Sequence, residues 1–456
     1  MVSGVSDQLA RSCFIIGGMD DNTKRLVIVG GGAAGLAAAI AAGEKARDRN
    51  VPLEVEVFER DDRVGRSILA TGNGRCNFSN AHPYVDDYNH PDFVEKTFWS
   101  LRFAFGKDAT DRDYKIVRDN GDEVHAFFYK HGLMWREEDD GRQYPKTNKA
   151  STVVDILRAS AARAGVREAC EHEVSAIEPP LEPGGRFTLK MSDSTLERAD
   201  AVIVACGGRA LSALRVASLP MKRQAPVLGP LRCSDACLPI VRELDNIRVR
   251  CVVSLVRGCS SEEKVVAEEK GELMFRKYGV SGICVFNLSR FALPGDALSV
   301  NFLGYSLCDA KDYLFRRRKL LAPVYGGNIT CSDVLRGLLL PRVADAVLMQ
   351  AGLTSKAVFT KAQVADLAQA LVAFRLDVAG IGDADNCQVR RGGFDVKAFD
   401  PATMEASDVP RLFAAGEALD VDGPCGGYNL HWAWASGLLA GLSAIDSLFD
   451  GDGSAR

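Results

Sequence analysis

The chain has 456 residues, of which 47% are hydrophobic, 25% charged and 8% aromatic. This composition is ordinary for a soluble globular protein and excludes a disordered chain, a collagen-like repeat and a small disulfide scaffold. Its 56 lysines and arginines face 60 aspartates and glutamates, for a formal net charge of −4. Overall charge therefore gives no reason to bind nucleic acid or an anionic membrane. At roughly 100–200 residues per domain, the length predicts two to four domains.

The thirteen cysteines are scattered and include no C-x-x-C pair. This pattern predicts reduced thiols in a cytoplasmic protein, with neither a metal site nor a disulfide framework. The apolar run Cys13–Ile16 is too short for a secretory signal. We expect residues 1–24 to form a disordered lead, with Met19 as an alternative start.

A β-α-β unit is predicted near the start of the chain. Leu26–Val29 is typical of a buried strand, Ala33–Arg47 of a helix with a small-residue face, and Leu53–Glu59 of a second strand. The uncharged run from residue 26 to 43 is about as long as a membrane span. Three consecutive glycines interrupt it, so we expect a strand, a turn and a helix, and no membrane segment.

The turn between this strand and helix fits G-x-G-x-x-G through Gly30, Gly32 and Gly35, with Ala33 and Ala34 at the variable positions. The first glycine allows the tight turn, the second lets a pyrophosphate approach the backbone, and the third allows close packing of helix on strand. The free N–H groups of the helix N-terminus attract the pyrophosphate. The motif predicts a dinucleotide site.

An acidic residue follows at the distance that this site requires. Glu59 ends the second strand, 24 residues after Gly35, where a carboxylate can accept a hydrogen bond from a ribose 2′-OH. It would repel a 2′-phosphate, which favours FAD or NAD over NADP. We assign the next residue, Arg60, to the same site.

Further along the chain, the predicted elements change in character. A helix at Thr152–Ala164 precedes strands at Glu171–Ile177, Arg186–Met191 and Ala199–Ala205. Short β-rich pieces then fill residues 228–303 and helix formers fill 304–380. From Ile381 the α/β pattern returns, with a strand at Arg411–Ala415 and an apolar helix at Asn429–Leu448. The simplest architecture is one α/β domain formed by both chain ends, with two insertions.

The C-terminal segment favours FAD over NAD. An extended FAD needs a second contact far along the sequence, where an acid bonds ribityl oxygens and a helix N-terminus faces the flavin N1–C2=O edge. A glycine-rich loop between the last strand and helix suits both tasks. Its candidate residues are Gly416, Glu417, Gly426, Gly427, Tyr428 and Asn429.

Four segments, at residues 64–80, 141–157, 271–282 and 416–437, together resemble the BaiN/RdsA family of NAD(P)/FAD-dependent flavoproteins, also known as aminoacetone-oxidase-like. The resemblance implies an α/β fold in which residues 25–225 and 381–456 form a Rossmann-type FAD-binding domain. It further implies an inserted antiparallel, barrel-like β domain at 226–303 and a helical subdomain at 304–380.

The same resemblance implies further cofactor contacts. A glycine turn would contact the flavin, Val174 would lie by the adenine, and the end of the middle strand would line the pyrophosphate–ribityl path. The residues are Asn73, Gly74, Arg75, Cys76, Asn77, Val174, Ala205, Cys206 and Gly207. The chain departs from the family at Ser67, where a lysine is usual, and at His431, where glutamine is common. The family's glycine- and threonine-rich loop after the middle strand is absent.

We expect an FAD-dependent oxidoreductase that reduces an activated C=C bond of a small molecule. No second dinucleotide loop follows a strand, so NADH or NADPH would dock transiently over the flavin unless another donor supplies the electrons. A side chain must protonate the substrate after hydride transfer. The candidate donors are Tyr278, Ser281 and His431.

Three alternatives remain open. Some members of this family reduce uridine in ribosomal RNA, and Arg316–Lys319 is the obvious basic cluster for an RNA contact, although such a run is usually a solvated helix face. An amine oxidase using O2 and a flavin-binding protein without activity are the others. The sequence leaves the oligomeric state open.

Overall fold

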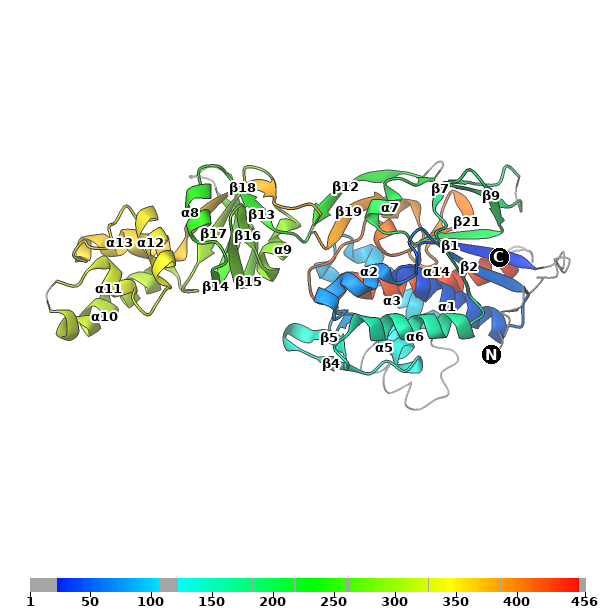
Figure 1. Ribbon diagram of the computed structural model, residues 1–456, viewed down its shortest axis with the longest axis horizontal. Coiled ribbons are helices and arrows are strands. Elements are labelled where there is room, and N and C mark those ends of the chain that lie inside the picture. The colour runs from blue at the N-terminus through cyan, green and yellow to red at the C-terminus, as the bar shows by residue number, and fades with distance from the viewer. Residues whose placement is uncertain are drawn as a thin grey trace, which may run out of the picture.

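The computed structural model describes residues 23–105, 122–182, 184–216, 219–258, 263–326, 328–385 and 387–450. The expected lead at 1–24 lies outside these residues except for its last two positions, and Lys24 already belongs to the first strand. The molecule is elongated (Figure 1). A Rossmann-type domain holds both ends of the described chain, a β-barrel follows, and a helical subdomain lies at the far end.

A six-stranded sheet with the order β20-β21-β10-β1-β2-β6 forms the centre of the Rossmann-type domain. All neighbours are parallel except β20 and β21. The predicted buried strands are confirmed as β1, β2, β10 and β21. The bounds are β1 Lys24–Val29, β2 Leu53–Glu59, β6 Arg167–Cys170, β10 Ala201–Val204, β20 Glu405–Ala406 and β21 Val409–Ala414.

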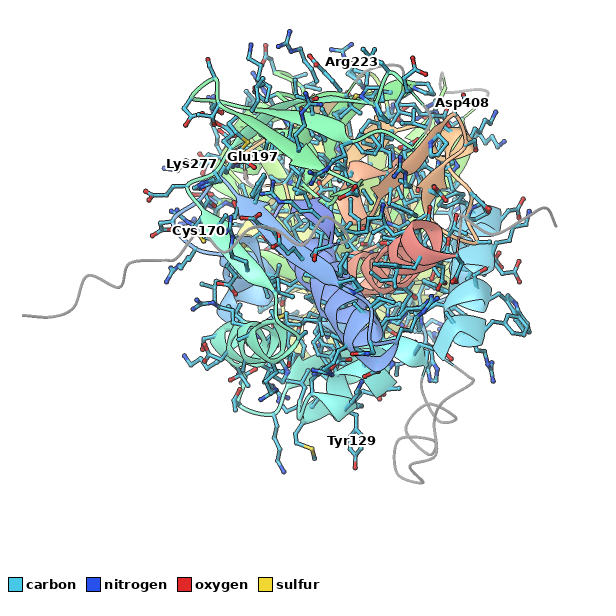
Figure 2. The ribbon with its side chains drawn as sticks, turned by 90° about the vertical axis from the view of Figure 1, so that its right-hand side faces the viewer. Tyr129, Cys170, Glu197, Arg223, Lys277 and Asp408 are labelled. Atoms are coloured by element: carbon cyan, nitrogen blue, oxygen red, sulfur yellow. The ribbon has the colours of Figure 1, made fainter. Side chains whose placement is uncertain are left out.

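Two helices from opposite ends of the chain, α1 (Ala33–Asp48) and α14 (Tyr428–Phe449), pack side by side (Figure 2). A Cβ on Gly437 would lie 2.3 Å from the carbonyl oxygen of Ala34, and one on Gly441 would lie 2.2 Å from that of Ala38. Both distances are below van der Waals contact, so only glycine permits this approach. This packing brings the two ends of the described chain together in one layer of helices.

Smaller elements surround the sheet. The helices are α2 Arg66–Ala70, α3 Pro91–Phe105, α5 Glu123–Lys130, α6 Ala150–Arg163 and α7 Gly208–Leu211, with 3-10 helices at Thr71–Gly74, Val85–Asp87, Asp139–Gly141, Val396–Ala398 and Gly416–Ala418. One small sheet contains β3 Ser79–Asn80, β4 Trp135–Glu137 and β5 Arg142–Pro145. Another contains β7 Val174–Glu178, β8 Phe187–Met191, β9 Leu196–Ala199 and β11 Arg215–Val216.

The inserted β domain is a closed six-stranded barrel with the order β13-β16-β15-β14-β17-β18. Its strands are β13 Leu231–Cys233, β14 Arg248–Arg257, β15 Lys264–Arg276, β16 Gly279–Ser281, β17 Ala297–Asn301 and β18 Phe374–Ile381, and its helices are α8 Leu238–Glu243 and α9 Ile283–Ser289. The segment from 374 to 380, expected in the helical subdomain, instead forms most of β18. It pairs with β17 and β13 and closes the barrel.

The helical subdomain is therefore nested between two barrel strands, β17 and β18. It contains α10 Leu307–Tyr325, α11 Cys331–Leu335, α12 Pro341–Gln350, a 3-10 helix at Lys361–Gln363 and α13 Val364–Val372. One hydrophobic core runs through both parts and includes Leu298 of the barrel, Leu314 and Leu371, all fully buried. A separate core fills the Rossmann-type domain. The described residues thus form two hydrophobic cores.

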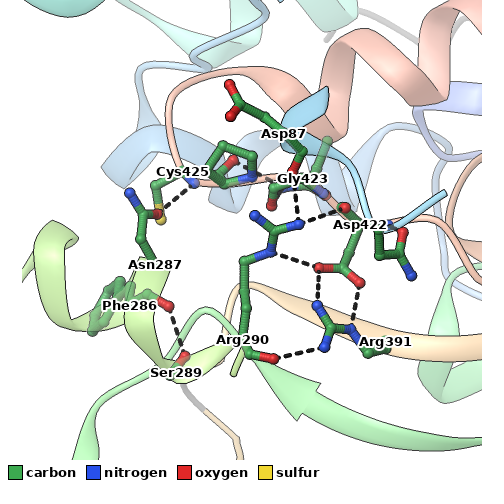
Figure 3. A network of polar contacts seen from close by, with 12 residues as sticks. Asp87, Phe286, Asn287, Ser289, Arg290, Arg391, Asp422, Gly423 and Cys425 are labelled. Atoms are coloured by element: carbon green, nitrogen blue, oxygen red, sulfur yellow. Dashed lines mark hydrogen bonds and ion pairs between the residues drawn. The ribbon is translucent and has the colours of Figure 1, made fainter. Parts of the chain in front are cut away.

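An antiparallel ribbon of β12 (Met221–Val227) and β19 (Val389–Phe394) carries the chain between the two cores. Beside it lies a buried ion triad (Figure 3). Arg290, the C-cap residue of α9, donates from Nε to Asp422 Oδ1 at 2.8 Å, and Arg391 of β19 donates from Nε to Asp422 Oδ2 at 2.6 Å. The Asp422 side chain is 0% exposed. The Asp422 carboxylate therefore joins the barrel to the Rossmann-type domain.

Three further observations apply to the described residues alone. No helix there is long and apolar enough to cross a membrane. No group of histidine, cysteine and acidic side chains is arranged there to hold a metal ion. The described cysteines are free thiols.

The triad yields a prediction about stability. Asp422→Asn leaves the buried Arg290 and the partly exposed Arg391 facing each other without a counter-charge, and breaking a buried pair in this way costs about 3–5 kcal/mol. We expect denaturant unfolding to show that loss, together with earlier release of the barrel unit. Glu272→Gln breaks the exposed Arg248–Glu272 pair and should cost at most about 1 kcal/mol. Equal losses in both variants would contradict this account of the triad.

Candidate functional site

The predicted dinucleotide loop has the backbone geometry that the motif requires. Gly30 has φ +107° and donates its N–H to the carbonyl of Phe58 at 2.8 Å. A Cβ on Gly35 would lie 1.9 Å from the carbonyl oxygen of Gly30. The N-cap of α1 is Gly32, and no side chain caps the helix. The first N–H groups of α1 are therefore available to an anion.

Glu59 braces this loop from the end of β2. Its Oε2 accepts a hydrogen bond from the Gly31 N–H at 2.8 Å, and its Oε1 accepts one from the Asp61 N–H at 2.9 Å. The sequence motif predicts a ribose contact for this carboxylate, and the structure adds the two backbone bonds that hold it at the loop.

A cavity of about 280 Å³ opens over the loop and brings the distant cofactor segments together. Its lining includes nine of the predicted residues: Gly30, Gly32, Glu59, Arg60, Val174, Ala205, Cys206, Gly207 and Glu417. Ala33, Ala34 and Gly35 lie behind the loop in α1. His172, whose ring lies 5.9 Å from that of Phe58, also lines the cavity next to the residue expected by the adenine, Val174.

The far wall of the cavity contains residues that the sequence analysis missed. Cys387, Gln388, Val389 and Arg390 come from the segment that enters β19. The backbone N–H of Arg390 donates to Glu417 Oε1 at 2.6 Å, and burial raises the pKa of Glu417 to about 7. No motif marks this segment, because its place at the cavity depends on the β12–β19 ribbon.

The predicted flavin turn is held in a left-handed conformation. Asn73 has φ +56° and Cys76 has φ +57°. Burial raises the pKa of the Cys76 thiol to about 12, so this thiol is neutral. Arg75 pairs with Glu138 at 3.2 Å and covers the Tyr144 ring, while Asn77 Oδ1 accepts from the Gln143 N–H at 3.1 Å. Gly74 follows Asn73 with φ +80°.

The glycine loop before α14 packs directly on the segment after this turn. Gly426 and Gly427 have φ +120° and +100°, and a Cβ on Gly427 would lie 2.2 Å from the carbonyl oxygen of Ser79. Asn80 Nδ2 donates to the Gly426 carbonyl at 2.9 Å. Within the loop, Asn429 Oδ1 accepts from the Gly423 N–H at 2.9 Å.

The remaining C-terminal candidates also hold this region together. Gly416, at φ +64°, donates its N–H to the Ser436 hydroxyl. The Tyr428 hydroxyl donates to Asp87 at 2.9 Å, and burial and this carboxylate raise its pKa well above the ordinary value. The residues expected at the flavin end of the site thus lie in two loops that contact each other.

His431, a candidate proton donor, lies inside a buried polar chain. It is 2% exposed, and its Nδ1 lies 2.8 Å from the Ser79 hydroxyl. Its Nε2 lies 3.3 Å from Asp122 Oδ2. Asp122 Oδ1 in turn contacts His125 Nδ1 at 2.9 Å, and His125 Nε2 lies 2.5 Å from Gln143. This series of polar contacts joins the two loops at the predicted flavin end to α5.

The protonation of this chain follows from its surroundings. Burial lowers the pKa of His431 to about 4. Burial alone would raise the pKa of Asp122 and lower that of His125, but the contacts of Asp122 with His431 and His125 reverse both directions. Near neutral pH we therefore infer an ionised Asp122 between a neutral His431 and a more basic His125.

The other two candidate donors are in the barrel. Ser281 is 9% exposed on β16. Tyr278 is partly exposed at the β15–β16 turn, where a Cβ on Gly382 would lie 2.7 Å from its ring. Gly382 immediately follows β18, on the segment that returns to the cavity wall.

A family model described as the HI0933-like protein Rossmann domain matches residues 24–443. The chain belongs to this family. It is an FAD-dependent oxidoreductase, as the resemblance implied.

Three relatives support the assignment. A 3-dehydro-bile acid delta(4,6)-reductase of Clostridium scindens is 30% identical over 93% of this chain and 99% of that protein. A ribosomal RNA dihydrouridine synthase of Escherichia coli is 28% identical over 90% of this chain and 95% of that protein. The protein of the same name from Haemophilus influenzae is 25% identical, covering 91% and 97%.

The residues present fit FAD. Glycines at positions 30, 32 and 35 leave the backbone open at the helix N-terminus, where a diphosphate is stabilised. The Arg390 side chain lines the same cavity, and two nitrogens of its guanidinium are buried without a hydrogen-bond partner. An anionic group is the chemistry that such a cavity accepts.

Glu59 gives a testable contribution to FAD binding. Glu59→Gln replaces one carboxylate oxygen with an NH2 group. This group is a donor and cannot accept a hydrogen bond from the backbone N–H that it faces. Losing a charge-assisted bond of this kind costs about 1.5–3 kcal/mol, so the dissociation constant for FAD should rise by at least about tenfold. Fluorescence titration of the apoprotein measures this. Glu54→Gln, on an exposed position of the same strand, should bind as the unmodified protein does.

His431 gives a prediction about pH. The folded protein takes up this proton near pH 4, whereas the ordinary pKa of histidine is 6.5. The unfolded state therefore binds more protons between these values, and stability falls as pH drops from 6.5 towards 4, by about 3 kcal/mol. His431→Gln should remove this part of the pH profile in urea unfolding. His82→Gln, an exposed control, should keep it; an unchanged profile in His431→Gln would disprove the assignment.

Proposed function

We propose that the protein reduces an activated C=C bond of a small molecule with electrons derived from NADH or NADPH. The observation that carries this proposal is the 30% identity, over nearly all of both chains, to the protein named as a 3-dehydro-bile acid delta(4,6)-reductase. The reaction pairs hydride transfer with protonation of the neighbouring atom. Bound FAD supplies the hydride from N5.

The chain's own residues have separate tasks in this proposal. The Gly30–Gly35 loop and Glu59 hold the dinucleotide part of the cofactor. The N-terminus of α14 would face the flavin edge of bound FAD and would stabilise negative charge there. His431 positions the loops through Ser79, because its ring is buried and both nitrogens have partners.

We propose Tyr278 as the proton donor, with Ser281 as the second candidate. The partial exposure of Tyr278 beside the returning segment at Gly382 supports this order, since Ser281 is buried. Tyr278→Phe should leave flavin reduction by the nicotinamide unchanged and slow flavin reoxidation by substrate by about 10² or more, the usual contribution of a general acid. Stopped-flow absorbance separates these half-reactions. Tyr305→Phe, at an exposed tyrosine of the loop after β17, is the matched control.

The function itself is tested by anaerobic titration with NADH and NADPH, followed by a panel of enones of increasing size. We expect the bleached flavin to recover its absorbance faster with enones than with the corresponding saturated ketones. No acceleration by any enone would reject the proposal. Rapid recovery with O2 and an amine substrate, with stoichiometric peroxide, would instead identify an amine oxidase.

The second candidate is reduction of uridine in ribosomal RNA, which the names of two relatives suggest. In the predicted contact run, Arg317 donates to the carbonyls of Val334 and Arg336, and Arg318 donates to that of Phe359. Arg316 and Lys319 are the exposed members. Since phosphate binding grows with the number of free cations, the small-molecule proposal is stronger. Dihydrouridine mapping of ribosomal RNA from a deletion strain tests the candidate, and unchanged RNA would exclude it.

A further inference from the structure

The Arg390 side chain has an unusual environment. Its Nε and Nη1 atoms are buried, and neither has a hydrogen-bond partner among the described residues. A guanidinium remains charged at any physiological pH and carries only donors. Burying such donors without acceptors is strongly unfavourable. An anion that enters the cavity from outside the chain would supply the acceptors that this partly exposed side chain lacks.

The backbone fixes Arg390 on the cavity wall. In the β12–β19 ribbon it lies opposite Pro226, and its N–H donates to Glu417 Oε1 at 2.6 Å. A Cβ on Gly208 would lie 2.8 Å from the Cβ of Arg390. The cavity that Arg390 lines also contains Gly30 and Gly32 of the dinucleotide loop. The residue is thus held by its backbone and by close packing, independently of its guanidinium.

Neighbouring acids leave two nitrogens of this guanidinium without a hydrogen bond. Glu417 accepts hydrogen bonds from the backbone N–H groups of Arg390 and Gly208, and burial raises its pKa to about 7, against the attraction of the Arg390 charge. The carboxylate of Asp422 is shared between Arg290 and Arg391. Among the described residues, the guanidinium of Arg390 therefore attracts Glu417 but has no hydrogen-bonded carboxylate of its own.

We propose that Arg390 binds the diphosphate of FAD from the wall of the cavity that faces the dinucleotide loop. The N-terminus of α1 offers backbone N–H groups and a partial positive charge, and the arginine offers a charged, bidentate fork that matches phosphate oxygens. Arg66 also lines the cavity, but it is 59% exposed and lies 3.5 Å from Asp62. Arg390 is thus a positioning residue for the cofactor. This inference rests on the FAD chemistry of the family and not on the proposed substrate.

The test compares Arg390→Gln with the unmodified protein after removal of FAD. The apoproteins are titrated with FAD, ADP and riboflavin, and release of FAD from each holoenzyme is followed by fluorescence. Loss of one charge-assisted contact should weaken FAD and ADP binding by about ten- to a hundredfold. Binding of riboflavin, which has no diphosphate, should be unchanged. Arg390→Lys should bind FAD with intermediate affinity, because lysine keeps the charge but loses the fork.

The melting temperature of the apoprotein distinguishes a ligand-binding arginine from an arginine with only a structural role. Removing an unpartnered buried cation should leave the melting temperature of the apoprotein unchanged or raise it, whereas removing a structural contact would lower it. Arg223→Gln, at an exposed arginine of β12 in the same ribbon, is the matched control and should change FAD affinity by less than about threefold. Unchanged FAD and ADP binding in Arg390→Gln, or an equal loss of riboflavin binding, would overturn the proposal. Enone reduction at saturating FAD reports separately on the proposed function.

Discussion

One buried carboxylate connects the two halves of this molecule. Asp422 is 0% exposed and pairs with Arg290 from the barrel and Arg391 from the connecting ribbon. Arg290 Nη2 also donates to the carbonyls of Asp422 and Asp87, and the adjoining Cys425 N–H donates to Asn287 of α9. Since a buried charge is tolerated only when it is paired and hydrogen-bonded, these contacts fix α9 of the barrel against the loop that begins α14.

This constraint is useful because the same loop is the predicted flavin end of the site. Gly426 and Gly427 precede α14, and that helix packs through Gly437 and Gly441 against α1, whose N-terminus is the predicted diphosphate end. The two ends of the cofactor site are therefore set by one rigid helix pair. The barrel and helical subdomain share a core, so the Asp422 contacts position that whole unit relative to the cofactor.

The sequence was informative wherever function depends on local backbone geometry. The dinucleotide loop is recognisable because three glycines and two flanking elements suffice to form it, and the glycines before α14 have the positive φ angles that a tight loop needs. Binary patterning likewise predicts the central strands. Sequence patterning places residues 374–380 in the helical subdomain, because a strand that pairs across a long insertion has no local signal that separates it from the helices before it.

Long-range polar contacts were also beyond sequence reasoning. His431 was recognised as unusual, but its partners Ser79 and Asp122 lie more than three hundred positions away in the chain. Arg390 gave no signal at all, because its importance depends on what its neighbours leave unpaired. Sequence patterns identify the residues that shape a loop. They do not show which charged side chains find hydrogen-bond or ion-pair partners in the folded protein.

The polar groups around the predicted cofactor site are of two kinds. The Asp422 triad and the His431 chain are satisfied within the protein, so they stabilise loops whether or not a ligand is bound. The guanidinium of Arg390 is held on a packed wall with two nitrogens unsatisfied. Because a satisfied network loses little when a ligand is absent, whereas an unsatisfied buried cation gains strongly from an incoming anion, the first kind shapes the site and the second contributes its affinity.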